Sequence, residues 1–484
     1  MSKRSLQAII TNFSALALGR LVAGVFNVVA LIFIANSLGA GDFGTYSLAL
    51  TLGILYGTLS QFGLSGLVTR EVAREPSTAK FYLSHGLLSI AMIGIPLFAL
   101  ALWGIAQAYP SQAGLLVWGV VSGLPKLVMD YVNALLFGID HVPKAAKFTA
   151  YHAVGSSALA LVMIALFKTP LIQIFQAQLL WGCLLLLWLL LELRAVLPHA
   201  PKQETRLRQA LLLLKRSVPF GIFALGSLLY FHADTLMLAS MRNVTEVGYL
   251  QAAMRIILAI DVFPVMLVSA LYPMASRLFT QDREGFSRLS QILLRYLLVL
   301  ALPMAFVVSE TAPLIIGQAF GPDFQASIPL LALLAWLIPI RFCGHLFGII
   351  LSASNRQAGR AAATVAATVL NIGLNGLMIP SMGAAGAGIA SLATSAGLVI
   401  FYALSSVKEL NLRQMLPDFG RLAISSGAMA LVALLAEPHG PILAASLATL
   451  TFAGSCLLLG VVPKAELATF WGAFRRREIS VGIH

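Results

Sequence analysis

Charged residues are scarce in this sequence. Only 11% of its 484 residues are Asp, Glu, Lys or Arg, while 59% are hydrophobic. A soluble globular domain carries about 25% charged residues, so this composition excludes an ordinary soluble protein and predicts a polytopic membrane protein. Cysteine is also rare, because Cys183, Cys343 and Cys456 are the only three. They lie far apart in apolar segments, so we expect no disulfide framework, metal site or cofactor.

Long apolar runs occupy most of the chain. At about 20 residues per crossing, they predict an all-α protein with about 14 transmembrane helices. The expected spans are 12–37, 43–66, 81–107, 113–137, 148–167, 170–192, 217–240, 246–275, 291–318, 326–352, 361–380, 383–406, 421–436 and 441–461. Pro380 and the EPHG turn at 437–440 separate the last two pairs only weakly. An even number of spans places both termini on one side of the membrane.

The basic residues are distributed very unevenly between the predicted loops. With the N-terminus inside, 25 of the 32 Lys and Arg residues fall in inward segments, and two, Lys168 and Arg242, fall in outward segments. The positive-inside rule makes this split a topology signal. The formal net charge of +13 therefore does not indicate nucleic-acid binding, since no single basic face collects these residues. We expect both termini to be cytoplasmic.

A basic loop at 193–216 contains prolines and separates the first six predicted spans from the last eight. Its LRQALLLLKR part is amphipathic. The turn SLGAGDFGTYSLAL resembles MRNVTEVGYLQAAM, with Gly44 and Gly248 in equivalent places. A parallel repeat of about six spans is typical of transporters whose halves are related by an axis along the membrane normal. The predicted parts are an N-terminal lobe at 1–192, a cytoplasmic amphipathic linker at 193–216, a C-terminal lobe at 217–407, and two more spans with a basic cytoplasmic tail at 408–484.

Several segments together resemble a known family. They are SLGAGDFGTYSLA, NVTEVGYLQAAMRI, LYPMASRL, AFGPDFQASIPLLALLA and VLNIGLNGLMIPSMGAAGAGIASLAT. In order and spacing they are similar to the polysaccharide transport family of lipid-linked oligosaccharide flippases, the Wzx-like branch of the multidrug/oligosaccharidyl-lipid/polysaccharide exporter superfamily. The resemblance implies two pseudo-symmetric six-helix lobes around a central cavity, with two C-terminal helices added. It also implies alternating-access transport of an isoprenoid-pyrophosphate-linked oligosaccharide from the inner to the outer leaflet of the cytoplasmic (inner) membrane.

Other functions remain open at this point. A cation-coupled multidrug exporter of the same superfamily would share the fold, but its substrates favour unpaired acids and aromatic residues. A membrane-embedded glycan polymerase or glycosyltransferase usually needs a sizeable outward loop, whereas the longest one predicted here has about ten residues. No metal-binding acid cluster or nucleotide loop is present, so we do not expect an enzyme. A passive scramblase would leave no motif. Membrane lipids, Na⁺ or H⁺, and polysaccharide assembly enzymes are the candidate partners besides the glycan.

Five basic residues fall inside the predicted spans, namely Arg20, Lys126, Arg255, Arg295 and Arg341. A charge near the bilayer centre costs about 3 kcal/mol, so each needs a reason to be there. A pyrophosphate headgroup would supply one, because a guanidinium fork binds phosphate oxygens bidentately. We predict that Arg20, Arg255 and Arg341 bind substrate, with Lys126 a further candidate. A structural ion pair is the alternative for each, and Arg295 is close enough to a span end to reach the interface.

Acidic residues at a similar depth in the membrane decide how many of these basic side chains are free to bind substrate. Lys126 and Asp130 are four residues apart on a stripe with Ser122 and Asn133, so they can neutralise each other. Asp261 lies about 120° around the helix from Arg255 and is expected to pair with another base. Asp234 is a candidate either for ion coupling or for an ion pair. Arg20, Gly24 and Asn27 form another polar stripe, and Asn371 and Asn375 are expected to hydrogen-bond between helices.

Overall fold

The computed structural model describes residues 3–197, 206–410 and 412–463, and within these ranges the chain is helical without strands. The basic tail from residue 464 onward and the middle of the predicted linker lie outside them. The α-helices are α1 (Lys3–Gln61), α2 (Leu64–Arg74), α3 (Ala79–Ala108), α4 (Ala113–Ser122), α5 (Leu124–Gly138), α6 (Val142–Phe167), α7 (Leu171–Val196), α8 (Leu207–Met241), α9 (Val244–Gln281), α10 (Arg283–Glu310), α11 (Ala312–Ala319), α12 (Ser327–Leu334), α13 (Leu337–Ala353), α14 (Gln357–Ser405), α15 (Val407–Leu410), α16 (Leu412–Ala436) and α17 (Pro441–Leu458). Three short 3₁₀ turns lie at Pro76–Thr78, Pro322–Phe324 and Glu437–His439.

Twelve helical segments of the described chain are long and apolar enough to cross a membrane. Two of them contain a break. α1 has a non-helical glycine at Gly39, with φ 76°, and α14 has one at Gly383, with φ 56°. A straight helix of 49 residues, the length of α14, would be about 74 Å long, more than twice the hydrocarbon thickness. The predicted number of about 14 spans stays a prediction, and the break in α14 falls three residues after Pro380.

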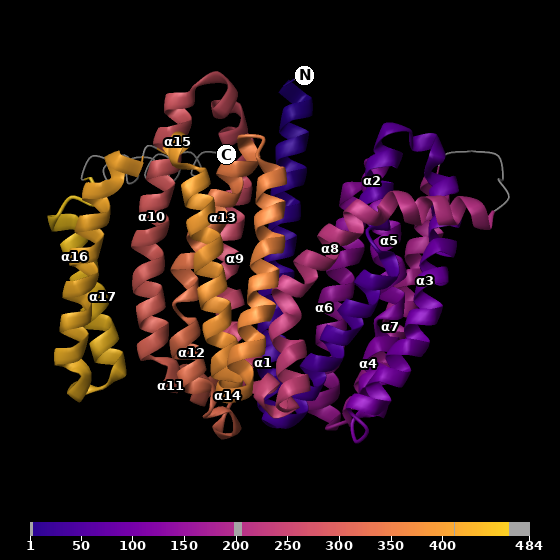
Figure 1. Ribbon diagram of the computed structural model, residues 1–484, viewed down its shortest axis with the longest axis horizontal. Coiled ribbons are helices and arrows are strands. Elements are labelled where there is room, and N and C mark those ends of the chain that lie inside the picture. The colour runs from indigo at the N-terminus through magenta and orange to yellow at the C-terminus, as the bar shows by residue number, and fades with distance from the viewer. Residues whose placement is uncertain (1–2, 198–205, 411, 464–484) are drawn as a thin grey trace, which may run out of the picture. The chain divides into compact units, whose positions relative to one another are not determined.

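Two compact units make up the chain, and they interleave along the sequence. The first contains Met1–Val262, Ile316–Leu330 and Ala361–Thr394. The second contains Phe263–Ile315, Leu331–Arg360 and Ser395–His484. The first unit includes α1 to α8, the beginning of α9 and much of α14. These helices can be found in Figure 1 by their labels and by the colour, which follows residue number. The division into two six-helix lobes stays a prediction.

Within the first unit, α1 and α9 cross at the two glycines of the predicted repeat. A Cβ placed on Gly44 would lie 1.8 Å from the carbonyl oxygen of Val244 and 2.9 Å from the amide nitrogen of Gly248. A Cβ on Gly248 would lie 2.1 Å from the carbonyl oxygen of Ala40. The backbones touch, which only glycine permits at such a separation. The equivalent positions of the repeat therefore meet each other.

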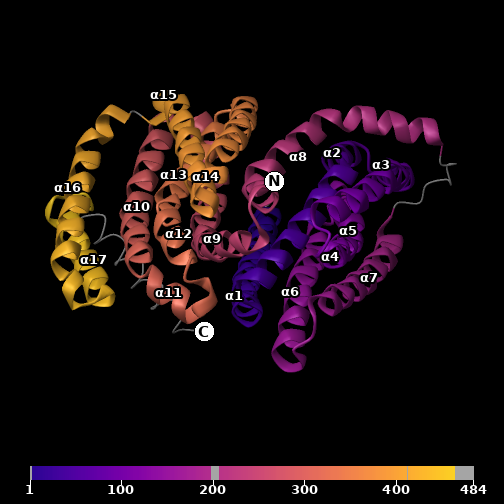
Figure 2. The same ribbon diagram turned by 60° about the horizontal axis from the view of Figure 1, so that its bottom comes forward.

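The first half of α8 runs across other helices of the first unit. In Figures 1 and 2 it passes over the ends of α2 and α3, and α8 contains Pro219 in its interior. The Ser89 hydroxyl of α3 donates to the carbonyl of Ala210 at 3.0 Å, and His85 Nε2 accepts from the amide of Arg206 at 3.2 Å. These bonds attach the start of α8 to α3. A position of this amphipathic segment along the membrane surface stays a prediction.

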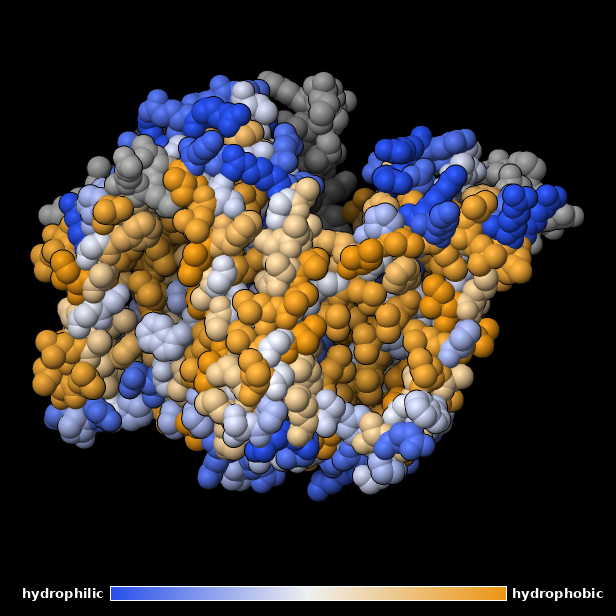
Figure 3. Space-filling view, viewed as in Figure 1, coloured by the Kyte–Doolittle hydropathy of each residue, from blue (hydrophilic) through white to orange (hydrophobic). Residues whose placement is uncertain are grey.

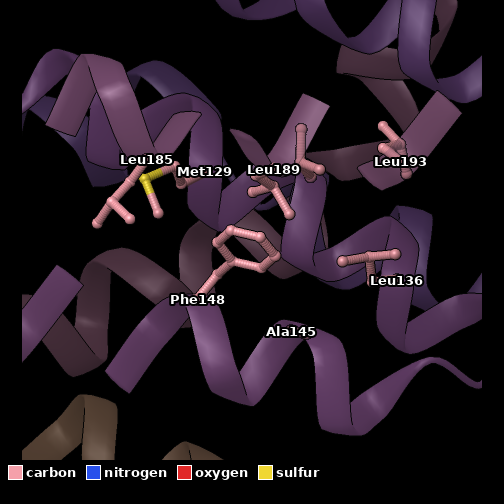
Figure 4. Packing of buried hydrophobic residues seen from close by; sticks show 8 residues of the cluster. Met129, Leu136, Ala145, Phe148, Leu185, Leu189 and Leu193 are labelled. Atoms are coloured by element: carbon pink, nitrogen blue, oxygen red, sulfur yellow. The ribbon is translucent and has the colours of Figure 1, made fainter. Parts of the chain in front are cut away.

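A hydrophobic cluster joins α5, α6 and α7 in the first unit. Its buried members include Met129, Val132 and Leu136 of α5, Phe148 of α6 and Leu189 of α7 (Figure 4). The three α5 residues follow a spacing of three and four, which places them on one helical face. Burial of a leucine or phenylalanine side chain contributes about 2–3 kcal/mol.

In the second unit, α10, α16 and α17 share a core around Phe306, Leu422 and Phe452. Arg295 of α10 lies near this core, where its guanidinium is 3.8 Å from the Asp418 carboxylate and donates to the carbonyl of Val461 at 3.4 Å. Arg295 therefore takes part in a structural ion pair, while its expected reach to the membrane interface stays a prediction. In Figure 3 hydrophobic side chains cover the middle of the visible helices, and hydrophilic ones gather over their ends.

Candidate functional site

The first unit contains a partly open cavity of about 730 Å³ between α1, α2 and α4 to α8. Ligand pockets in proteins usually measure about 300–1,000 Å³, so this one has room for a ligand. Its described walls mix leucine, phenylalanine and glycine with many polar side chains. The polar side chains are Asn27, Tyr46, Thr58, Gln61, Ser65, Ser122, Lys126, Asp130, Asn133, Thr149, His152, Ser156, Ser157 and Gln178.

One face of α5 contributes the charged part of this wall. Lys126, Asp130 and Asn133 line the cavity from α5, and Ser122 lines it from the end of α4, so the predicted stripe borders the cavity from two consecutive helices. The Lys126 ammonium forms an ion pair with the Asp130 carboxylate at 2.5 Å, and both side chains are nearly half exposed. This contact favours the alternative in which the two charges neutralise each other. Binding of pyrophosphate by Lys126 stays a prediction, with less to support it.

Arg255 is different, because it lies in the middle of a span and has no acidic partner among the described residues. It is in the part of α9 that belongs to the first unit, and its side chain is mostly buried. No carboxylate of the described residues pairs with it, and its buried Nε has no hydrogen-bond partner among them. Its guanidinium interacts electrostatically with the side chains of Tyr46 on α1 and His232 on α8. A buried guanidinium that is not neutralised by a carboxylate is a strong candidate for holding an anionic ligand.

Asp234 of α8 is held by neutral groups of α14. The side-chain amide of Asn375 donates to its Oδ1 at 2.6 Å, and the Ser391 hydroxyl donates to its Oδ2. Asn371 also hydrogen-bonds the carboxylate, and its own Oδ1 accepts from Asn375 at 2.9 Å. The expected hydrogen bonding of Asn371 and Asn375 between helices is confirmed. The described part of the chain gives Asp234 no basic partner, so the ion-pair alternative loses support.

The structure does not group the other predicted residues. Arg20 lies on α1, but its side chain is outside the described residues. Arg341 is on α13 in the second unit, partly buried and with its own interactions. Asp261 is buried, being 7% exposed, and also has partners. A joint pyrophosphate site of Arg20, Arg255 and Arg341 therefore stays a prediction.

Several polar residues at these sites were not predicted from the sequence. Tyr46 stacks on Phe175 with ring centroids 5.4 Å apart, and its hydroxyl accepts from the Gln178 side chain at 3.3 Å. His152 lies close enough to Lys126 and Asp130 to interact electrostatically with both. Ser391 reaches Asp234 from 157 positions further along the chain. Of these residues, only Tyr46 belongs to a pattern that is visible in the sequence, namely the repeated turn.

Comparison with known proteins gives a matching family and a matching fold. A family model described as "Polysaccharide biosynthesis protein" matches residues 9–279. A protein of Haloferax volcanii named "Probable low-salt glycan biosynthesis flippase Agl15" is 22% identical over 421 residues, which are 84% of this chain and 86% of that protein.

Solved structures with the same fold include two transporter types. The structure titled "Lipid II flippase MurJ, inward closed conformation" has a TM-score of 0.71 at 14% identity and covers 91% of this chain and 98% of its own. An inward-facing multidrug resistance MATE family transporter of the MOP superfamily has a TM-score of 0.62 at 15% identity, over 83% of this chain and 99% of its own. These likenesses confirm the fold class of an all-helical, multi-pass membrane protein. Because the family model covers more than half of the sequence, the chain belongs to the polysaccharide biosynthesis protein family.

Proposed function

We propose that this protein is a flippase that moves an isoprenoid-pyrophosphate-linked oligosaccharide from the inner to the outer leaflet of the cytoplasmic membrane by alternating access. The observation that carries the proposal is Arg255, a mid-span guanidinium without a carboxylate partner among the described residues. A pyrophosphate is an anion that must cross a low-dielectric layer, and a guanidinium that is already desolvated binds it strongly. Family membership and the relative named as a glycan biosynthesis flippase support the same substrate class.

The proposal is tested by reconstituting the purified protein into liposomes. The probe is a polyprenyl pyrophosphate carrying one fluorescent sugar, and an impermeant quencher reports how much of it reaches the outer leaflet. We expect the protein to exchange the probe between leaflets and to leave a fluorescent cationic dye inside the vesicles. Export of the dye without exchange of the lipid would contradict the proposal and favour the multidrug-exporter alternative.

We propose further that Asp234 couples this transport to a Na⁺ or H⁺ gradient. An ionised carboxylate in a low-dielectric region is costly when only neutral groups contact it, as Asn375 and Ser391 do here. Binding of a proton or a small cation would remove that cost. Occupancy of Asp234 would then change with the gradient, and the contact between α8 and α14 would change with it.

An Asp234→Asn variant tests the coupling. The amide has nearly the same shape but cannot be ionised, so we expect transport to continue at the rate found without a gradient. The measurement is the ratio of transport rates with and without an imposed cation gradient. Glu284→Gln is the control, because Glu284 is 84% exposed and should leave the ratio unchanged. A gradient response retained in Asp234→Asn would show that coupling occurs elsewhere.

A further inference from the structure

Two neighbouring helices of the first unit hold a lysine against two aromatic rings. α6 and α7 share a hydrophobic core and lie side by side (Figure 2). The Lys147 ammonium of α6 is 5.5 Å from the centre of the Tyr151 ring and 4.9 Å from the centre of the Trp188 ring of α7. The two rings stack with centroids 5.7 Å apart, and they are 42% and 40% exposed. A cation over aromatic faces is attracted to them, so Lys147 is oriented on an exposed aromatic surface.

This contact lies near one end of both helices. Lys147 is five residues after Val142, where α6 begins, and Trp188 is eight residues before Val196, where α7 ends. These offsets are about 8 and 12 Å along the helix axes. Each helix has 26 residues and is therefore about 39 Å long, whereas the hydrocarbon layer is about 30 Å thick. We therefore expect the three side chains near the boundary between hydrocarbon and headgroups, where tryptophan and tyrosine are enriched.

A stripe of exposed leucines on α7 leads to the same end. Leu180, Leu184, Leu187 and Leu191 follow a spacing of four, three and four residues, which places them on one helical face. They are between 55% and 67% exposed. The stripe is about 17 Å long, close to half the thickness of the hydrocarbon layer. Its length therefore matches one acyl chain of one leaflet, and the exposed Arg194 follows three residues after its last leucine.

The charged groups at this end have an excess of positive charge. The Lys144 ammonium forms an ion pair with the Glu192 carboxylate at 2.8 Å. Glu192 also interacts electrostatically with Lys147, and Asp140, in the turn before α6, forms no ion pair with any of the described bases. Arg194 has no ion-pair partner among the described residues. Three bases and one acid on these two helices give a net charge of +2 beside an apolar stripe.

We propose that the α6–α7 surface, formed by Lys147, Tyr151, Trp188, Arg194 and the leucine stripe, is a docking surface for an anionic phospholipid of the surrounding leaflet. One acyl chain packs along the leucines, and the anionic headgroup meets Lys147 and Arg194. A zwitterionic phospholipid carries its own cation in the headgroup, so the two bases attract it less. The inference concerns a resident lipid and does not depend on the proposed function.

Tryptophan quenching by brominated lipids tests this surface on the purified full-length protein in detergent. The probes are phosphatidylglycerol, which is anionic, and phosphatidylcholine, which is zwitterionic, each with brominated acyl chains that quench nearby tryptophans. Trp188→Phe keeps an aromatic ring beside Lys147, so the difference between wild type and this variant isolates the signal of Trp188. We expect phosphatidylglycerol to reach half-maximal quenching at about tenfold lower concentration than phosphatidylcholine, corresponding to about 1.4 kcal/mol.

A double variant identifies the bases as the source of this preference. Lys147→Gln with Arg194→Gln should remove the tenfold difference and leave quenching by phosphatidylcholine unchanged. Both side chains are exposed, so we expect the variant to fold normally. The matched control is Arg283→Gln with Arg288→Gln, which removes two exposed bases of α10, one of them 3.5 Å from the centre of the Phe279 ring. This control should keep the preference.

Equal quenching of Trp188 by the two lipids in wild type would overturn the proposal and leave the rings as ordinary interfacial anchors. A preference retained in the double variant would overturn it as well. Unlabelled polyprenyl pyrophosphate carrying one sugar should displace the brominated phosphatidylglycerol no better than unlabelled phosphatidylglycerol does. Stronger displacement would overturn the phospholipid as the occupant and assign the surface to the transported lipid. Exchange of lipid between leaflets is measured separately, so failure of this inference leaves the flippase proposal standing.

Discussion

Replacing Arg255 with alanine is expected to lower the rate of transport of a pyrophosphate-linked sugar by about 100-fold. This value corresponds to the loss of two charge-assisted hydrogen bonds of about 1.4 kcal/mol each. The same variant should remain folded. Among the described residues Arg255 has no ion-pair partner and its Nε has no hydrogen bond, so truncation removes a desolvated charge and breaks no pair. We expect an unchanged or slightly higher melting temperature. Flipping rate and melting temperature, measured on one purified sample, check both parts.

Two further variants make this result specific. Arg255→Lys keeps the positive charge but loses the planar fork, so its transport should lie between that of wild type and alanine. Arg288→Ala removes one positive charge at an exposed pair with Glu284, where both side chains are at least 70% exposed, and should change neither measurement. If Arg255→Ala instead lowers the melting temperature or prevents expression, Arg255 is a structural residue and the pyrophosphate interpretation fails.

Replacing Gly44 with alanine is expected to destabilise the protein by about 3 kcal/mol, the upper end of the usual cost of overpacking. The new methyl group would lie 1.8 Å from the Val244 carbonyl oxygen, and no rotamer change can move a backbone atom away. α1 and α9 would have to separate at their crossing. A lower melting temperature, with loss of transport, checks this expectation, and Gly248→Ala should behave similarly because its methyl group would meet the carbonyl of Ala40.

The matched control for this prediction is Gly104→Ala. Gly104 is a helical glycine of α3 with no neighbouring atom within 4 Å of an added Cβ. Alanine there should stabilise the helix by about 0.5–1 kcal/mol through its lower backbone entropy. A Gly44→Ala variant as stable as the Gly104→Ala variant would show that the crossing is not as close as the backbone positions indicate.

The sequence predicted the helices well, because membrane solvation acts on each segment independently. Every crossing needs about 20 apolar residues, whatever its neighbours are, and the resulting runs are visible in the sequence. The expected spans at 81–107, 113–137 and 326–352 correspond within about two residues to α3, to α4 with α5, and to α12 with α13. Pro380 indicated the break in α14, although the residue that leaves the helical conformation is Gly383.

Polar stripes were also predictable, since a helix places residues four apart on one face. Lys126, Asp130 and Asn133 share the cavity wall as their spacing indicated. The same rule cannot tell which neighbouring helix a stripe faces. Asp234 is held by Asn375 and Ser391, and these contacts depend on how α8 packs against α14. The spacing of residues along the sequence does not predict how these two helices pack.

By itself, the sequence determined an all-helical membrane protein, the approximate ends of its spans, and the set of intramembrane charges that need an explanation. Only the tertiary structure decided which of those charges are neutralised. Lys126 is paired within its own helix and Arg295 is beside Asp418, whereas Arg255 interacts electrostatically with Tyr46 and His232 and pairs with no described carboxylate. The physical reason is that hydrophobicity is a property of each segment, while the cost of a buried charge depends on the groups that neighbouring helices bring within a few ångströms.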